Sequence, residues 1–100
     1  MIWKREGDAF LAGVDFATWP IQAGETLVNA NARGSLAVTV EDQAGADKTS
    51  QAIDGAPSID GSKVVFMLAA GLVKGSYKVK VTAPTSDDEL LTEVVGLRVV

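Results

Sequence analysis

The sequence predicts an all-β fold, a sandwich of about six or seven short antiparallel strands in one domain of 100 residues. Two observations lead to this prediction. Apolar and polar residues alternate with the period of two expected for half-buried strands, and Gly, Pro, Asp and Ser gather between these segments at regular intervals. No linker, low-complexity tract or repeat interrupts residues 1–100, so we expect a single domain.

Three segments give the clearest strand signals. Residues 36–41 and 77–82 alternate most regularly between apolar and polar side chains. The residues expected to point inward are Leu36, Val38, Val40, Tyr77, Val79 and Val81. Residues 63–69 form a nearly continuous apolar run between Gly61 and Gly71, which predicts a strand covered on both faces.

The remaining strands are expected at residues 10–16 and 26–30 and at the C-terminus. The run from Glu89 to Val100 fits either a helical stripe or a strand, and its ending, with Gly96 among β-branched residues, favours a final strand. The stretches between the strands are rich in turn-forming residues and are expected to be connections. These stretches are residues 42–48, 54–61 and 83–88.

The composition excludes several classes of function. The chain has 13 acidic and 9 basic residues, which argues against nucleic-acid binding, and Lys78 with Lys80 is interpreted as a solvated face. It has no Cys, no His and no Ser-x-x-Lys motif, so we expect neither an enzyme nor a zinc site, and no cofactor. No apolar run approaches the roughly 20 residues that span a bilayer, and no membrane association is expected.

Two acidic groups could in principle offer oxygen ligands to Ca²⁺. These are Asp54 with Asp60, and the run from Asp87 to Glu89. Neither spacing matches a calcium-binding loop, and carboxylates in loops usually accept hydrogen bonds from nearby backbone N–H groups. We therefore expect structural roles for both groups.

Four of the six aromatic residues lie before residue 20. Residues 1–8 are expected to form an N-terminal arm, on which Trp3 is available to a partner chain. Trp19 and Pro20 follow where an edge strand would end, so Trp19 either closes the open end of the sandwich, which we favour, or anchors an interface. The candidate interface residues are Trp3, Phe16, Trp19 and Pro20.

Four motifs in order carry a family resemblance. They are Asp15-Phe16-Ala17-Thr18-Trp19, Gly24-Glu25-Thr26-Leu27-Val28, Lys63-Val64-Val65-Phe66-Met67-Leu68-Ala69-Ala70-Gly71 and Gly75-Ser76-Tyr77-Lys78-Val79-Lys80-Val81-Thr82. Together they resemble small immunoglobulin-like structural proteins of tailed bacteriophages, in particular the fiber-tail adaptors, which are neck or tail accessory proteins. The resemblance extends from Lys4 to Val100 and implies an immunoglobulin-like β-sandwich.

The resemblance also implies a function. It predicts a virion component of the tail or neck that is assembled in the bacterial host cytoplasm, forms a homo-oligomeric ring and links other neck or tail proteins. The alternative is a carbohydrate- or surface-binding immunoglobulin-like module, because such sandwiches also carry ligand sites on their loops and faces. A sugar site would need Trp3, Trp19 or Tyr77 exposed on a flat face.

Overall fold

The structure of the protein is a computed structural model that describes residues 1–16 and 25–100. The fold is mostly β, with a single helical turn among the described residues. The strands are β1 (Ile2–Lys4), β2 (Phe10–Asp15), β3 (Ala30–Asn31), β4 (Gly34–Ser35), β5 (Ala37–Asp42), β6 (Ile53–Asp60), β7 (Lys63–Leu68), β8 (Gly75–Pro84) and β9 (Leu90–Val99), and the helical turn is α1 (Thr49–Ala52). No helix among the described residues is both long and apolar enough to cross a membrane.

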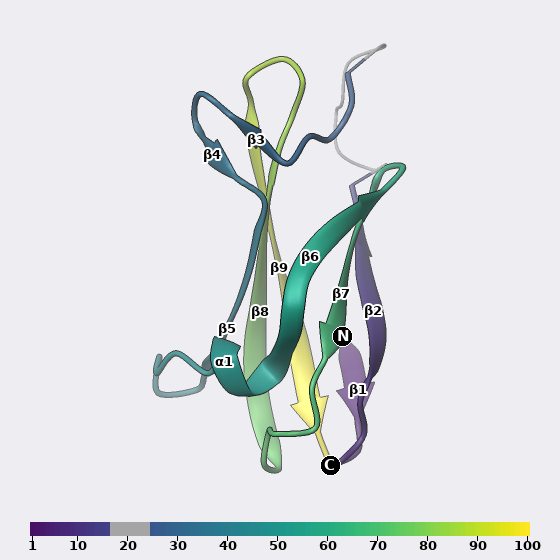
Figure 1. Ribbon diagram of the computed structural model, residues 1–100. Coiled ribbons are helices and arrows are strands. Elements are labelled where there is room, and N and C mark those ends of the chain that lie inside the picture. Colours follow the sequence, from purple (N-terminus) through teal and green to yellow (C-terminus); the bar gives the residue numbers. More distant parts are fainter. Residues whose placement is uncertain (17–24) are drawn as a thin grey trace.

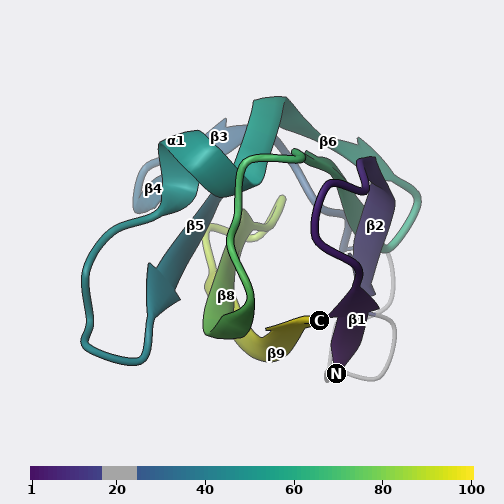
Figure 2. The ribbon, with the colours of Figure 1, turned by 90° about the horizontal axis from the view of Figure 1, so that it is seen from below.

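The strands form two larger sheets and one small hairpin. One sheet has the order β1-β9-β8-β5, the second has the order β2-β7-β6, and β3 pairs with β4. Every pairing is antiparallel except that of β1 with β9, which is parallel. The two larger sheets lie face to face (Figure 1), and the view along the strands shows them as two layers (Figure 2).

The hydrophobic core lies between these layers and draws on both of them. The four-stranded sheet contributes Val38, Val40, Tyr77, Val79, Val81, Leu97 and Val99, and the three-stranded sheet contributes Val14, Val64, Phe66 and Leu68. Burying an aliphatic or aromatic side chain of this size stabilises a fold by about 1.5–3 kcal/mol. The alternation of apolar and polar residues thus puts one face of each sheet in the core.

Most of the expected strands are confirmed. The strands predicted at residues 10–16, 36–41 and 77–82 correspond to β2, β5 and β8, with Val38, Val40, Tyr77, Val79 and Val81 buried as expected. The C-terminal run is β9, which pairs with β8 over ten residues from Leu90 to Val99. This long pairing explains why a segment that also fits a helical stripe forms a strand.

Three predictions about strands are wrong. Residues 54–61 were expected to be a connection, but most of them belong to β6, where a bulge between Asp54 and Ser58 absorbs the turn-forming residues. Residues 26–30 do not form one strand: Leu27 makes an isolated bridge to Thr85, and only Ala30 lies in a strand, at the start of β3. β7 is covered mainly on one face: Val64, Phe66 and Leu68 are buried, whereas Lys63 and Met67 on the other face are exposed.

The expected N-terminal arm is also corrected in part. Residues 2–4 are not a free arm but the edge strand β1 of the four-stranded sheet, with Ile2 opposite Leu97 and Lys4 opposite Val99. The signal for this strand was weak because it is only three residues long. Its parallel pairing with the last strand depends on residues almost a whole chain length away.

The β3–β4 hairpin is attached to the turn between β8 and β9 by side-chain hydrogen bonds. Asn31 Nδ2 donates to the backbone oxygens of Thr85 and Glu89 at 3.0 and 2.9 Å, and Arg33 Nε donates to Asp88 O at 2.6 Å. Asn31 Oδ1 also accepts from the backbone N–H groups of Arg33 and Gly34. One asparagine therefore holds both its own hairpin and the neighbouring turn.

Replacing Asn31 with alanine is expected to lower the free energy of unfolding by about 1–2 kcal/mol, because several hydrogen bonds worth roughly 1 kcal/mol or less each are lost together. Urea denaturation followed by tryptophan fluorescence would measure this change. Ala32→Ser, a change at an exposed position of the same hairpin, is the control and should be near neutral. Equal stability of Asn31→Ala and the native protein would contradict the anchoring role.

Candidate functional site

The structure separates the residues predicted to form an interface. Trp3 is 65% exposed, whereas Phe16 is fully buried in the core, with 0% of its surface exposed. Trp19 and Pro20 lie outside the described residues. Phe16 therefore offers no side-chain surface to a partner, because the alternation of β2 continues through it and turns it inward beside Val14.

Trp3 points outward because of its register in β1. Residues paired across a sheet project to the same side, and Trp3 lies opposite the exposed Arg98, whereas Ile2 and Lys4 face inward opposite Leu97 and Val99. The backbone hydrogen bond from Val100 N to Lys4 O, at 2.8 Å, continues the pairing beyond the end of the strand. The indole is thus carried by a sheet strand.

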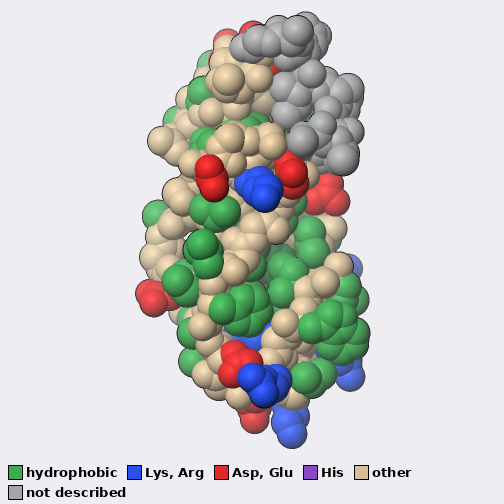
Figure 3. Space-filling view, turned by 90° about the vertical axis from the view of Figure 1, so that its right-hand side faces the viewer, with side chains coloured by type: hydrophobic (Ala, Val, Ile, Leu, Met, Phe, Trp, Pro, Cys, Tyr) green, Lys and Arg blue, Asp and Glu red, His purple; other side chains and the backbone are tan. Residues whose placement is uncertain are grey.

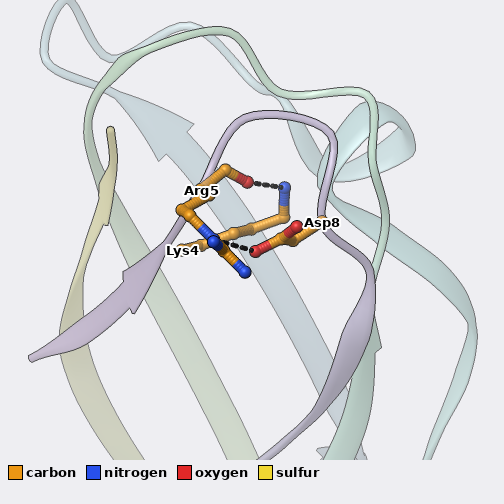
Figure 4. A network of polar contacts seen from close by, with 3 residues as sticks. All are labelled: Lys4, Arg5 and Asp8. Carbon is orange, nitrogen blue, oxygen red and sulfur yellow. Dashed lines mark hydrogen bonds and ion pairs between the residues drawn. The ribbon is translucent and has the colours of Figure 1, made fainter.

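Polar contacts fix the turn that follows β1 (Figure 4). Lys4, which is buried, donates from Nζ to the backbone oxygen of Arg5 at 3.2 Å. Arg5 Nε donates to Asp8 Oδ2 at 3.1 Å, and the backbone N–H of Asp8 donates to Arg5 O, also at 3.1 Å. These contacts define where β1 ends and orient the connection to β2.

The outer face of the four-stranded sheet, which we call the Trp3 face, carries a group of exposed apolar side chains. Met1, Trp3 and Val94 are its large hydrophobic members. A Cβ atom on Gly96 would lie 2.9 Å from Met1 Cε, so the Met1 side chain lies over Gly96. The apolar group therefore spans β1 and β9 at one side of the sheet.

The rest of the Trp3 face is mainly basic. Its exposed charged residues on β5, β8 and β9 are Glu41, Lys78, Lys80 and Arg98, three cations against one carboxylate. A depression of about 300 Å³ on this face is lined by Thr39, Glu41, Lys78, Lys80 and Val94. Lys78 and Lys80 were interpreted from the sequence as a solvated face, and the pairing of β8 with β9 places Arg98 on the same face.

The outer face of the three-stranded sheet, which we call the Leu11 face, has a second apolar group. Leu11 is 62% exposed and lies opposite the exposed Met67, and the next outward pair is Gly13 with Val65. Gly13 has no side chain, and a Cβ there would approach Val65 Cγ1 to 3.3 Å. An open hollow of about 500 Å³ also lies on this face and is lined by Leu11, Ala12, Gly13, Asp15, Asp60, Lys63 and Val65.

The charged residues around this hollow are mainly acidic, whereas those of the Trp3 face are mainly basic. The outward charged residues of β2, β6 and β7 are Asp15, Asp54, Asp60 and Lys63, three carboxylates against one cation. Ser62 Oγ donates to Asp15 Oδ1 at 2.8 Å, which holds that carboxylate at the end of β2. Figure 3 shows the side of the molecule where β1 and β2 lie, with hydrophobic side chains gathered between charged ones.

The two sheets differ in how their edges are protected. At β5 the backbone N–H of Val40 donates to Thr49 Oγ1 at 2.9 Å, and Val40 O accepts from Lys48 N at 2.7 Å, so the edge is covered. Asp47 Oδ1 accepts from the Thr49 hydroxyl and backbone N–H, and these bonds lower the pKa of Asp47. These backbone groups of β5 are therefore not available to pair with a strand of another chain.

The edge of β2 is more open. Phe16 N donates to Ser62 O at 2.9 Å, which places Phe16 and alternate residues before it in hydrogen-bonded pairs with β7. The backbone groups of Leu11 and Gly13 therefore point away from β7, and no hydrogen bond joins them to the described part of the chain. The open edge borders the hollow of the Leu11 face.

The acidic groups considered for Ca²⁺ do not form clusters. Asp54 and Asp60 lie near opposite ends of β6, and residues 87–89 form a turn in which Thr85 Oγ1 accepts from the backbone N–H groups of Asp87 and Glu89. Among residues 1–16 and 25–100, no three His, Cys, Asp or Glu side chains are placed to hold a metal ion. Among the described residues, the exposed apolar and charged side chains are grouped on the Trp3 face and on the Leu11 face.

No protein-family model matches the chain, and no curated protein matches it either.

Proposed function

We propose that the two layers form an immunoglobulin-like β-sandwich. The strand order supports this, since β2, β6 and β7 form one sheet while β5, β8 and β9 form the other, the division of strands found in immunoglobulin-like domains. Tyr77 supports it as well. Its hydroxyl donates to Val73 O at 2.7 Å near the start of the second-to-last strand, as in the tyrosine corner of these domains.

We propose that the protein is a structural virion protein that links neck or tail components of a tailed bacteriophage through protein–protein contacts. The observation that carries this proposal is Trp3, an exposed indole held on a sheet strand beside Met1. Trp is enriched among the residues that dominate binding energy at protein interfaces, and exposed apolar groups of this kind mark interaction sites. The resemblance to fiber-tail adaptors supplies the kind of assembly.

The test is binding of the purified protein to isolated neck and tail proteins, measured by biolayer interferometry with the native chain and Trp3→Ala. Truncating an indole at an interface centre commonly costs 2 kcal/mol or more, so we expect at least ~30-fold weaker binding. Val73→Ala is the matched control, because Val73 is 66% exposed but lies outside both faces. Absence of any neck or tail partner would refute the proposal.

A second candidate function is favoured by the same side chain. An exposed indole on a sheet face can also act as a stacking platform for a sugar ring, whereas Tyr77 is buried and cannot serve. A glycan array probed with the monomeric protein separates the two functions. The assembly proposal expects no glycan signal, and a signal that disappears in Trp3→Ala would replace it with a carbohydrate-binding module.

A further inference from the structure

We propose that copies of this chain associate front to back, with the Trp3 face of one copy on the Leu11 face of the next. The inference rests on the proposed assembly function and names the surfaces that would carry it. The two faces belong to different sheets and lie on opposite sides of the molecule (Figure 2). Each copy would therefore use both faces at once, and the contact is heterologous, the type that generates rings or filaments.

Charge complementarity identifies a second copy as the occupant. The Trp3 face presents Lys78, Lys80 and Arg98 with Glu41, a local excess of positive charge. The Leu11 face presents three carboxylates with Lys63, an excess of negative charge of the same size. The positively charged Trp3 face of one copy attracts the negatively charged Leu11 face of another, whereas two copies of the same face repel each other. The charge pattern therefore favours front-to-back association over a symmetric dimer.

The apolar groups are complementary in shape. The Trp3 face projects bulky side chains from β1, and the Leu11 face has an open hollow lined in part by Leu11, Gly13 and Val65, in which the Val65 side chain lies close to Gly13. An indole seated over Gly13 would cover Leu11 and Val65 and lose its own exposure to water. Trp3 is thus the projecting group and the Gly13 hollow the receiving one.

The molecule is long enough for a contact of ordinary size along its side. The Cα atoms extend 41 × 21 × 21 Å, so the outline of one long side is comparable to the roughly 800 Å² per partner that standard protein interfaces bury. On both faces the apolar group lies toward an edge strand, β1 or β2, and the charged residues lie beside it on the neighbouring strands. The rotation between successive copies decides whether the assembly closes.

The test uses two charge-reversal variants, studied by sedimentation velocity over a range of concentrations. Lys78→Glu with Lys80→Glu makes the Trp3 face negative, and Asp54→Lys with Asp60→Lys makes the Leu11 face positive. Each variant alone would then present two faces of like charge, and we expect self-association at least tenfold weaker than in the native protein. Higher ionic strength should weaken native association as well.

Mixing the two variants gives the decisive result. Every contact between unlike variants again joins a positive to a negative face, so the mixture should assemble although neither variant does alone. Lys48→Glu with Lys74→Glu changes the charge equally but lies outside both faces and should leave association unchanged. Native protein that stays monomeric, or variants that remain monomeric when mixed, would overturn the stacking.

The test of front-to-back association can fail while the test of the proposed virion function succeeds, and the reverse. Trp3-dependent binding to neck or tail proteins by a strictly monomeric native chain would retain the assembly role and overturn the stacking. Reassembly of mixed variants without any neck or tail partner would retain the stacking and refute the virion role. Circular dichroism of each variant shows that its fold is intact before association is measured.

Discussion

Phe16→Ala is expected to lower the free energy of unfolding by about 3–5 kcal/mol, because it removes a fully buried aromatic side chain and leaves a cavity in the core. A typical domain is stable by only about 5–15 kcal/mol, so much of the margin of a 100-residue fold would be lost. Thermal unfolding followed by circular dichroism, together with urea denaturation, would measure the change.

Trp3→Ala is the matched control for this prediction. Both residues were expected at an interface from the sequence, yet Trp3 is exposed on β1 and its removal should change stability by about 0.5 kcal/mol or less. The pair therefore separates folding from binding: Phe16→Ala should unfold at lower urea, and Trp3→Ala should fold normally and bind poorly. A native-like midpoint for Phe16→Ala would place that side chain outside the core.

The alternating strands could be predicted from the sequence because their signal is local. In β8 the inward residues Tyr77, Val79 and Val81 are separated by polar ones, which is sufficient to specify both the strand and its buried face. The burial of Phe16 could be read in the same way, since it continues the alternation of β2. Its assignment to an interface gave more weight to aromatic clustering than to periodicity.

The strands that were missed depend on distant partners. β6 contains Gly55, Pro57 and Ser58, which locally favour a turn, and it forms because its ends pair with β7 while a bulge accommodates its middle. β1 has only three residues and pairs with β9 at the other end of the chain. Neither partner is visible in a short window of sequence.

The candidate faces were likewise only partly predictable. Trp3 was identified from the sequence as a side chain available to a partner, and it is exposed. The charged residues on the same face come from β5, β8 and β9. The net charge of this face can be worked out only when the strand order β1-β9-β8-β5 is known, and the periodicity of the sequence does not give that order. The hollow of the Leu11 face was missed for a similar reason, because its lining comes from β2, β6 and β7 and depends on how these strands pair.

Tyr77→Phe is expected to lower the free energy of unfolding by about 1–2 kcal/mol while leaving the fold intact. The phenyl ring would keep its place in the core, but the 2.7 Å hydrogen bond from the hydroxyl to Val73 O would be lost. That bond joins the loop before β8 to the strand itself. Urea denaturation of the two proteins measures the difference, and identical midpoints would contradict a bracing role.

The same hydroxyl should make stability depend on pH in the alkaline range. Burial raises the pKa of Tyr77 above its ordinary value of 10.0, and the nearby carboxylates of Asp42 and Glu6 act in the same direction. A pKa raised in the folded state means that this stabilisation is complete below pH 10 and is lost as the pH rises through the folded-state pKa. The native protein should therefore lose stability above pH 10.

Tyr77 is the only tyrosine in the chain, so phenolate absorbance reports on this group alone. We expect the absorbance midpoint of the folded protein to lie above 10 and to return to about 10 in denaturant. Lysines also titrate in this range, so the part of the alkaline destabilisation that is absent from Tyr77→Phe is the contribution of the tyrosine. A folded-state midpoint at or below 10 would show that the hydroxyl is solvated and that the corner is open.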